Sequence, residues 1–289
     1  MPWPALALVL AAALLHALWN VAAKKSGGGP HFAFLSALMV SVLWAPIALV
    51  LAVDELPRWG LAEWLAVTAS AFVHVLYFSA LLRGYERADL TVVYPVARGS
   101  GPLLTAAGAV LLLGERPGPV AVLGVLAVCG GVFLIAGGPA LFSRGHDPRV
   151  RAGVKWGVIT GTMIAGYSVI DGYAVKVLLV GPILLDWFGN LLRVPMLAPQ
   201  AWRARATLRS AWAAQWRYAL VVATLGPLAY IMVLYALKWA PLSAVAPARE
   251  VSMLFAALLG GRLLGEGHRG ARVAGALCIG GGVIALASG

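Results

Sequence analysis

Polar and aromatic side chains recur three or four residues apart inside otherwise apolar stretches of this sequence. Residues at this spacing share one face of a helix. Cations, carboxylates, imidazoles and hydroxyls on such faces can bind the polar groups of a small molecule where water is scarce. For each aromatic alone, the alternative is core packing or a place in an interface belt. The five sets of candidate binding residues are His16, Trp19 and Asn20; His74, Tyr77 and Phe78; Tyr94 and Arg98; Tyr167 and Asp171; and Arg249 and Glu250.

Arg98 and Arg249 are the sharpest candidates, because each follows a proline within an apolar run. A proline inside a helix frees a carbonyl and bends the axis, and membrane proteins place such breaks along cavities. Pro95 and Pro247 are therefore predicted hinges, each beside a cation that grips a carboxylate or phosphate. We expect Glu250 to neutralise Arg249 while the site is empty. The alternative is that both long side chains reach the membrane interface.

Further carboxylates stand in two other settings. Asp186, Asn190 and Arg193 form a polar row at helical spacing, in which Asp186 either pairs with Arg193 or carries protons. Glu115 and Glu266 lie beside glycines at predicted helix ends, where capping or pairing between helices is expected rather than transport.

The composition is that of a membrane protein. The 289 residues are 61% hydrophobic and only 11% charged, with a mean hydropathy of +0.88, whereas soluble domains carry about 25% charged residues. The net charge of +11 lies mainly in short gaps between apolar runs, which favours contact with lipid head groups and excludes nucleic acid. Cys129 and Cys278 are expected to pack as small hydrophobic residues. No metal or cofactor is expected.

Ten apolar runs are long enough to cross about 30 Å of hydrocarbon. Most links between them are very short, so neighbouring helices should run antiparallel as in a bundle. The fold class is therefore predicted as all-α, with ten transmembrane helices. The predicted spans are Pro4–Ala23, Phe32–Val53, Leu61–Leu82, Leu90–Leu113, Val120–Gly137, Gly153–Tyr173, Val177–Ala198, Trp216–Lys238, Leu242–Leu264 and Ala271–Ala287.

The sequence repeats itself after about 151 positions. The run from Pro95 to Gly114-Glu115 returns as Pro247 to Gly265-Glu266, and each copy ends in a Gly-Gly-Val helix. We therefore divide the chain into a first five-helix repeat at residues 1–137, a connecting loop at 138–152 and a second repeat at 153–289. Because five is odd, the second copy must enter the membrane in the opposite sense, which predicts an inverted repeat.

Glycines seven residues apart mark the fifth and tenth predicted helices. Gly124 and Gly131 lie on one helix face, and Gly275 and Gly282 repeat that spacing. Small residues at this spacing let helix backbones approach closely. We expect these glycines to serve packing rather than binding.

The basic residues predict the orientation. Links of odd number hold fifteen Lys and Arg residues near helix ends, and links of even number hold four. Since cytoplasmic loops collect positive charge, the odd links are expected in the cytoplasm and both termini outside.

These features resemble the EamA branch of the drug/metabolite transporter superfamily over essentially the whole chain. The resemblance rests on His16-Ala-Leu-Trp-Asn20, on the two Pro…Gly-Glu helices and on the two Gly-Gly-Val helices. It implies a ten-helix carrier of metabolites that works by alternating access, and a likeness to YddG-type exporters of amino acids. The family is usually drawn with cytoplasmic termini; we favour the charge distribution.

One departure concerns proton coupling. The small four-helix relatives in the superfamily use a glutamate in their first helix for proton exchange. The first helix here has His16 and Asn20 but no carboxylate. The resemblance therefore does not support proton coupling by that route.

We interpret the chain as a monomeric carrier in a bacterial plasma (inner) membrane, and not as an enzyme. Its expected partner is a small molecule, with an aromatic or neutral amino acid the best candidate and export the direction implied by the resemblance. Arg98 or Arg249 would hold the carboxylate. Trp19, Tyr77, Tyr94 and Tyr167 would stack against the side chain.

Three alternatives remain at this point. A carrier of phosphorylated or nucleotide-linked sugars would need more than two cations facing its cavity. An intramembrane serine protease would need Ser100 within hydrogen-bond reach of His74. A lipid scramblase or a structural bundle would turn the polar stripes toward lipid.

Overall fold

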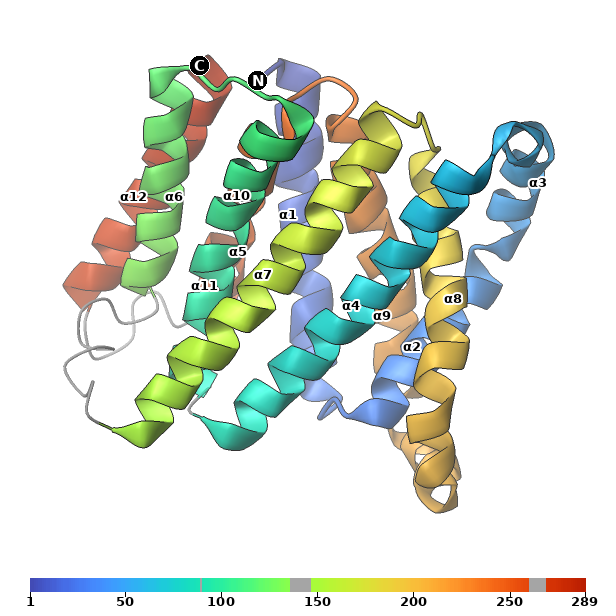
Figure 1. Cartoon of the computed structure of the whole chain (residues 1–289). Helices are drawn as coiled ribbons and strands as arrows, with labels where there is room; N and C mark the ends of the chain where they lie inside the picture. Colours follow the sequence, from blue (N-terminus) through green and yellow to red (C-terminus); the bar gives the residue numbers. More distant parts are fainter. Residues whose placement is uncertain (89, 136–146, 260–268) are drawn as a thin grey trace.

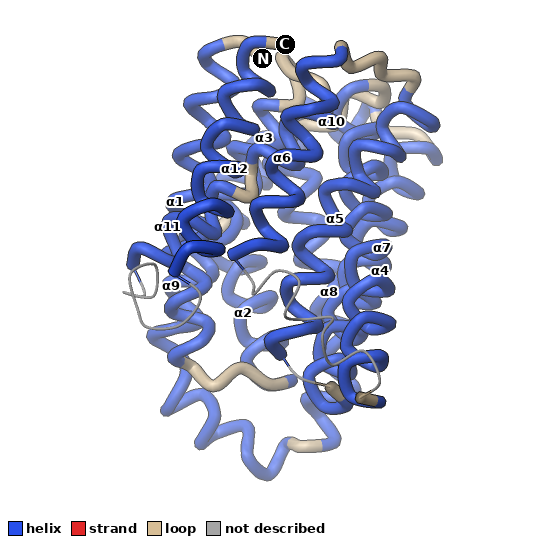
Figure 2. Tube along the Cα trace, turned by 90° about the vertical axis from the view of Figure 1, so that its left-hand side faces the viewer, coloured by secondary structure: helices blue, strands red, loops and turns tan. Residues whose placement is uncertain are grey.

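The computed structural model describes residues 1–88, 90–135, 147–259 and 269–289, which form helices and short connections and contain no strand. The longer helices run roughly along a common direction (Figure 1, Figure 2). In chain order they are α1 Trp3–Lys25, α2 Pro30–Leu43, α3 Ala45–Glu55, α4 Leu61–Arg87, α5 Leu90–Leu113, α6 Pro119–Ile135, α7 Pro148–Lys176, α8 Pro182–Arg203, α9 Leu208–Ala236, α10 Leu242–Ala248, α11 Val251–Leu259 and α12 Arg269–Ser288.

Six of these helices are long and apolar enough to cross a membrane, and the bent pair α2 and α3 makes a seventh among the described residues. The predicted count of ten is not confirmed for the other three runs. As described, α6 has 17 residues, and α8 carries the polar row from Asp186 to Arg193. The run predicted at 242–264 is divided into α10 and α11, with residues 260–264 outside the described part.

The second predicted span bends at Trp44, where α2 ends and α3 begins at an angle of 61°. Pro46 is the second residue of α3, and a proline there cannot donate to the carbonyl one turn earlier. The bend is held by two indole N–H groups: Trp44 Nε1 donates to the Ala223 carbonyl at 3.0 Å, and Trp187 Nε1 donates to the Ser41 carbonyl at 2.9 Å. Tertiary contacts to α9 and α8 therefore fix a kink that hydropathy alone does not show.

The break between α10 and α11 lies at Arg249 and Glu250. Pro247 has no N–H for the helical ladder, and the next bonds span three residues: Glu250 N–H donates to the Pro247 carbonyl and Ser252 N–H to the Arg249 carbonyl. Pro95, by contrast, lies inside the unbroken helix α5. The two predicted hinge positions thus differ, and the helix is interrupted only beside Pro247.

Helices α6 and α12 pack on each other through the glycines that were predicted to serve packing. A Cβ on Gly131 would lie 2.6 Å from the Gly275 carbonyl oxygen, and one on Gly124 would lie 2.9 Å from the Gly282 carbonyl oxygen. The packing role expected for these glycines is confirmed. The earlier glycine of α6, Gly124, contacts the later glycine of α12, Gly282, and the later one, Gly131, contacts the earlier one, Gly275. The two helices therefore run antiparallel.

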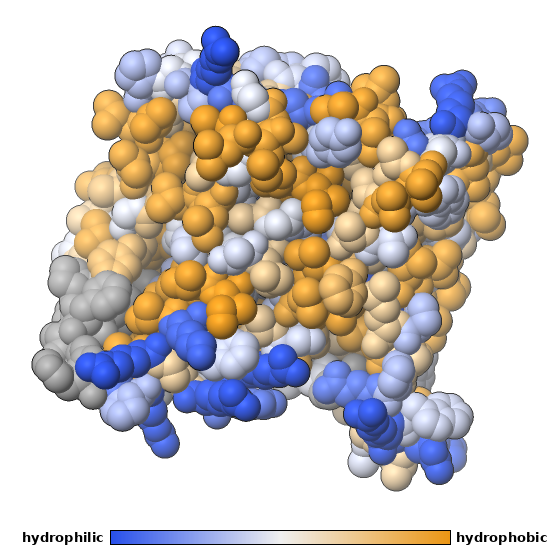
Figure 3. Space-filling view, viewed as in Figure 1, coloured by the Kyte–Doolittle hydropathy of each residue, from blue (hydrophilic) through white to orange (hydrophobic). Residues whose placement is uncertain are grey.

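The two ends of the molecule differ in charge. The chain termini lie together at one end (Figure 1), where the Met1 amine donates to the carbonyls of Leu286 and Ala287 at 3.3 and 2.9 Å. Hydrophilic residues gather along the opposite end, below a broad apolar band (Figure 3). Large apolar side chains are exposed on several helices, as Leu111 of α5 is with 80% exposure. Such a surface fits lipid contact.

Candidate functional site

An ion pair between helices joins the two halves of the chain inside the bundle. The Arg98 guanidinium, from α5, lies 3.1 Å from a Glu250 carboxylate oxygen and donates to the Ser252 hydroxyl at 3.1 Å. The Glu250 side chain is buried, with 5% exposure, and the Arg98 side chain is half-buried, with 16% exposure. The expectation that Glu250 neutralises Arg249 is therefore wrong. Adjacent residues in a helical turn point in different directions, so Glu250 faces α5 while Arg249 faces elsewhere.

Arg249 lies over an aromatic ring instead of a carboxylate. Its guanidinium carbon is 5.4 Å from the centre of the Tyr230 ring, a cation–π geometry. Among the described residues no carboxylate lies within ion-pair distance of this guanidinium. The Tyr230 hydroxyl donates to Oδ2 of Asp171, on α7. Asp171 is 1% exposed, and its Oδ1 has no hydrogen-bond partner in the described part of the chain.

An aromatic stack continues from this group toward α4. The rings of His74 and Tyr167 stack with centres 3.8 Å apart, and Tyr230 meets His74 edge-on at 6.0 Å. Tyr77 meets Tyr167 edge-on at 5.9 Å. His74 Nδ1 is 2.9 Å from the Ser70 carbonyl oxygen, one turn earlier in α4. The structure thus brings five of the predicted residues into one network: His74, Tyr77, Tyr167, Asp171 and Arg249.

The predicted residues of α1 contact one another. In α1, the His16 ring meets the Trp19 ring edge-on at 4.7 Å, and the Asn20 amide donates to the His16 carbonyl at 2.7 Å. Phe78 and Tyr94 are half-buried, and among the described residues no hydrogen bond or ring contact ties either of them to the network.

The polar row of α8 is arranged in steps. The Asn190 side-chain amide donates to an Asp186 carboxylate oxygen at 3.2 Å, and Arg193 donates to the side-chain Oδ1 of Asn190 at 3.3 Å. The Asn190 side chain therefore bridges Asp186 and Arg193, which do not form an ion pair with each other in the described structure. Within the described helices, this row and the groups above it comprise three guanidinium groups and three carboxylates: Arg98, Arg193 and Arg249, and Asp171, Asp186 and Glu250.

Sequence reasoning missed Tyr230 and Ser252. Tyr230 lies in the apolar helix α9 with no charged neighbour in its own turn, so nothing in the local pattern sets it apart from a packing residue. The one available signal is Gly226-Pro227 in the preceding turn, a pair that can mark a bend along a cavity.

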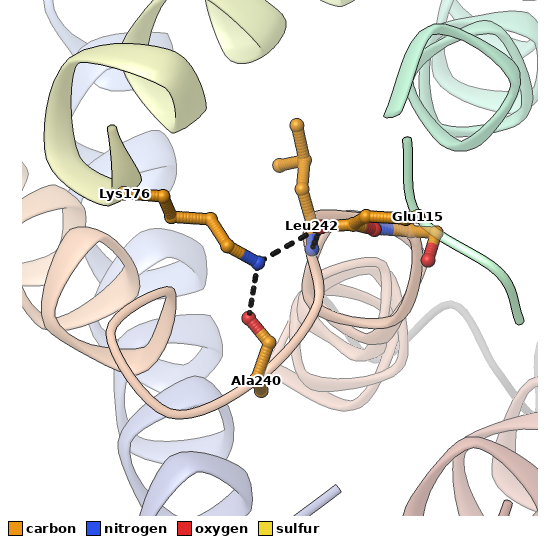
Figure 4. A network of polar contacts seen from close by, with 5 residues as sticks. Glu115, Lys176, Ala240 and Leu242 are labelled. Carbon is orange, nitrogen blue, oxygen red and sulfur yellow. Dashed lines mark hydrogen bonds and ion pairs between the residues drawn. The ribbon is translucent and has the colours of Figure 1, made fainter. Parts of the chain in front are cut away.

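A second charged cluster lies near the end of the molecule that carries the termini. The Glu115 carboxylate accepts hydrogen bonds from Lys176 Nζ at 2.9 Å and from the backbone N–H groups of Leu242 and Ser243 at 2.7 and 2.9 Å (Figure 4). Lys176 also donates to the Ala240 carbonyl at 3.3 Å. We call these contacts the Glu115 latch. The expected capping and pairing role of Glu115 is confirmed; Glu266 lies outside the described residues.

The latch sets the ionisation of Glu115. Burial alone would raise the pKa of this carboxyl, but the Ser243 N–H, the Lys176 ammonium and the Leu242 N–H stabilise the anion and lower the pKa below its ordinary value. Glu115 is therefore ionised at neutral pH, and its charge holds the start of α10.

Two hollows lie on opposite sides of α10. The inner one, about 10 Å³, is lined by Ser168, Asp171, Tyr230 and Arg249 and by apolar residues that include Leu242 and Val245. It has room for about one water. The outer one, about 260 Å³, lies beside the chain termini and is lined by Glu115, Ser243 and Ala244 among others. Helix α10 is thus a wall between them, and Arg98 lines neither.

The arrangement does not suit serine hydrolysis. The Ser100 hydroxyl donates to the Val96 carbonyl at 2.6 Å, and His74 stacks on Tyr167. No hydrogen bond joins Ser100 to His74 in the described part of the chain, so the base cannot activate the nucleophile in this geometry.

Comparison with known proteins agrees with the fold. The family model described as the EamA-like transporter family matches residues 3–137 and again residues 151–288. A solved structure, described only as the crystal structure of a protein, superimposes with a TM-score of 0.69 over 99% of this chain and 97% of its own, at 21% identity. Identity at that level indicates a common fold alone. No match was found among curated proteins.

Proposed function

This chain belongs to the EamA-like transporter family, whose model matches it twice over nearly its full length, and we propose that it exports a small neutral or aromatic amino acid. The transport would be of the secondary type, across a bacterial plasma membrane. The observation that carries this proposal is the half-buried guanidinium of Arg249, which has no carboxylate partner among the described residues and lines a cavity together with the buried carboxylate of Asp171.

The balance of charge in the interior favours a substrate without net charge. Three guanidinium groups stand with three carboxylates, and Arg98 is already neutralised by Glu250. A buried charge must be paired to be tolerated in a medium of low dielectric constant. A zwitterionic amino acid adds one charge of each sign and keeps the balance. A sugar phosphate brings about two negative charges, whereas among the described residues Arg249 is the one cation that lines the inner cavity.

The proposed cycle is alternating access between two inverted halves. Support comes from the antiparallel packing of α6 on α12, which are equivalent helices of the two repeats, through Gly124, Gly131, Gly275 and Gly282. The inner cavity holds about one water, so the helices around it must separate to admit a substrate. We take α10 as the wall that moves, with the hinge at the break beside Pro247.

The orientation proposed from the sequence places both termini outside. The latch and the outer hollow would then face the outside, and the strongly basic end would face the cytoplasm. In this orientation, opening α10 away from α7 and α9 would release an exported substrate through the outer hollow. A monomer contains every element that this route needs.

The test is flux through the purified protein in liposomes. With radiolabelled phenylalanine outside and unlabelled phenylalanine inside, we expect exchange in liposomes that contain the protein and none in empty ones. Arg249→Ala should abolish the exchange, while Arg58→Ala, which removes an exposed cation, should leave it unchanged. If Arg98→Ala and Arg249→Ala both exchange phenylalanine like the wild type, binding of the carboxylate by these residues is refuted. Exchange of sugar phosphates but not of amino acids would support the other substrate class.

A further inference from the structure

We propose that Asp171, Tyr230 and Arg249 form a clasp for a zwitterion, in which Arg249 binds the carboxylate of the substrate and Asp171 binds its ammonium group. This inference rests on the proposed function and names the chemistry that the site would select. It requires both charged groups on one small molecule, and so separates amino acids from simple amines and simple carboxylic acids.

Arg249 is the better of the two central cations for a carboxylate. Arg98 already has a carboxylate at 3.1 Å and a hydroxyl at 3.1 Å. Among the described residues, the partner of the Arg249 guanidinium is the face of the Tyr230 ring, at 5.4 Å. A ring face cannot satisfy the in-plane N–H donors of a guanidinium. Its backbone lies in the break between α10 and α11, so its position depends on the same turn that would move in the transport cycle.

Asp171 offers a half-satisfied carboxylate. Oδ2 accepts a hydrogen bond from the Tyr230 hydroxyl, and Oδ1 is buried without a partner among the described residues. An ionised carboxylate has sites for about four hydrogen bonds, and leaving them unmet in a buried place is costly. An ammonium group supplies three donors and the opposite charge, and would satisfy Oδ1.

Tyr230 keeps the two charges apart. Its hydroxyl contacts the acid and its ring contacts the base, so Asp171 and Arg249 line one cavity without forming an ion pair with each other. Direct pairing would leave neither charge available to a ligand. Held on two sides of a tyrosine, the acid and the base can each bind the opposite charge of a molecule that enters between them.

The test compares ligands that differ by one charge. The purified full-length protein in detergent would be mixed with phenylalanine, N-acetylphenylalanine, phenylalanine amide, phenethylamine or 3-phenylpropionate, and thermal unfolding would be followed. The wild type is expected to bind phenylalanine at least about tenfold more tightly than any molecule that lacks one of the two charges. Equal binding of phenethylamine or 3-phenylpropionate would overturn the clasp.

The variants assign each charge. Asp171→Asn should remove the preference for phenylalanine over N-acetylphenylalanine, and Arg249→Gln should remove the preference for phenylalanine over its amide. Asp186→Asn removes another buried carboxylate, on α8, and should keep both preferences. Tyr230→Phe keeps the ring but not the hydroxyl, and should weaken both. Size-exclusion profiles and melting points without ligand would show whether each variant folds.

The outcomes separate this inference from the proposed function. If the wild type binds and exchanges phenylalanine but Asp171→Asn and Arg249→Gln keep both preferences, the clasp is wrong and the amino-acid carrier stands. If Asp171→Asn keeps the preferences and only abolishes the response of flux to a pH gradient, Asp171 carries a proton, and its assignment to the substrate is overturned. If the wild type neither binds nor exchanges any amino acid, the proposed function itself fails.

Discussion

Replacing Glu115 with glutamine should destabilise the protein measurably, because one carboxylate holds three separate donors. It accepts from Lys176 at 2.9 Å, from Leu242 N–H at 2.7 Å and from Ser243 N–H at 2.9 Å. These donors lie at the end of α7 and the start of α10, far from Glu115 in the sequence. Glutamine keeps one acceptor oxygen but turns an NH₂ group toward the other donors, so at least one contact is lost.

The expected loss is about 2 kcal/mol. Each backbone N–H that loses a capping acceptor costs about 1 kcal/mol, and the amide retains part of this. The pair with Lys176, whose side chain is 29% exposed, adds about 0.5–1 kcal/mol, since solvent screens it. A loss of about 2 kcal/mol corresponds to a melting point about 4–8 °C lower.

Thermal unfolding in detergent at several pH values provides the assay. The folded-state pKa of Glu115 is lowered, so its contribution is fully present above the ordinary pKa of glutamate, about 4.3, and is lost as the pH falls through the folded-state pKa. The melting points of the wild type and Glu115→Gln should therefore differ at pH 7 and converge on acidification. Glu63→Gln is the control, because Glu63 caps Gly60 N–H at an exposed helix start, and it should have the smaller effect. A difference below about 1 °C at pH 7, or one that does not shrink in acid, would refute the reasoning.

Two further predictions concern the interior. Gly131→Ala should lower stability by about 1–3 kcal/mol, because its Cβ would lie 2.6 Å from the Gly275 carbonyl oxygen. The control is Gly130→Ala, whose Cβ would meet nothing within 4 Å and which should be neutral or stabilising. Equal melting points for the two variants would argue against the glycine contact. Glu250→Gln should cost about 3–5 kcal/mol, because it leaves the Arg98 guanidinium buried without its ion pair. Adding Arg98→Met should recover part of that loss in denaturation measurements, and the absence of any recovery would contradict the pairing.

Much of the architecture could be predicted because the helices and one of their contacts follow from regular spacings of apolar residues and glycines in the sequence. The apolar runs indicate the helices, and the glycines seven residues apart indicate the contact of α6 with α12. Glu115, beside a glycine at a helix end, was correctly expected to cap or pair. The kink at Trp44 was missed because a proline near the start of a helix, as Pro46 is in α3, is also compatible with a straight apolar run.

The partners of the charged residues could not be predicted. Glu250 follows Arg249 directly, and this neighbourhood suggested a pair, but the turn between α10 and α11 directs Glu250 to Arg98. That choice depends on how α5 packs against the second half, which the local sequence does not encode. Tyr230 was missed for the same reason, since its role comes from Asp171 and Arg249 on other segments.

The central claim is that the small cavity beside Asp171 opens alternately to the two sides of the membrane. Ser168 lines this cavity and is 6% exposed, so Ser168→Cys, in a variant without Cys129 and Cys278, places a thiol within it. Labelling with a membrane-impermeant maleimide in right-side-out and inside-out vesicles tests the claim most directly. We predict labelling from both sides, slowed in each case by phenylalanine. A thiol that reacts from one side only, or that reacts from neither side in a variant that still transports, would contradict the account.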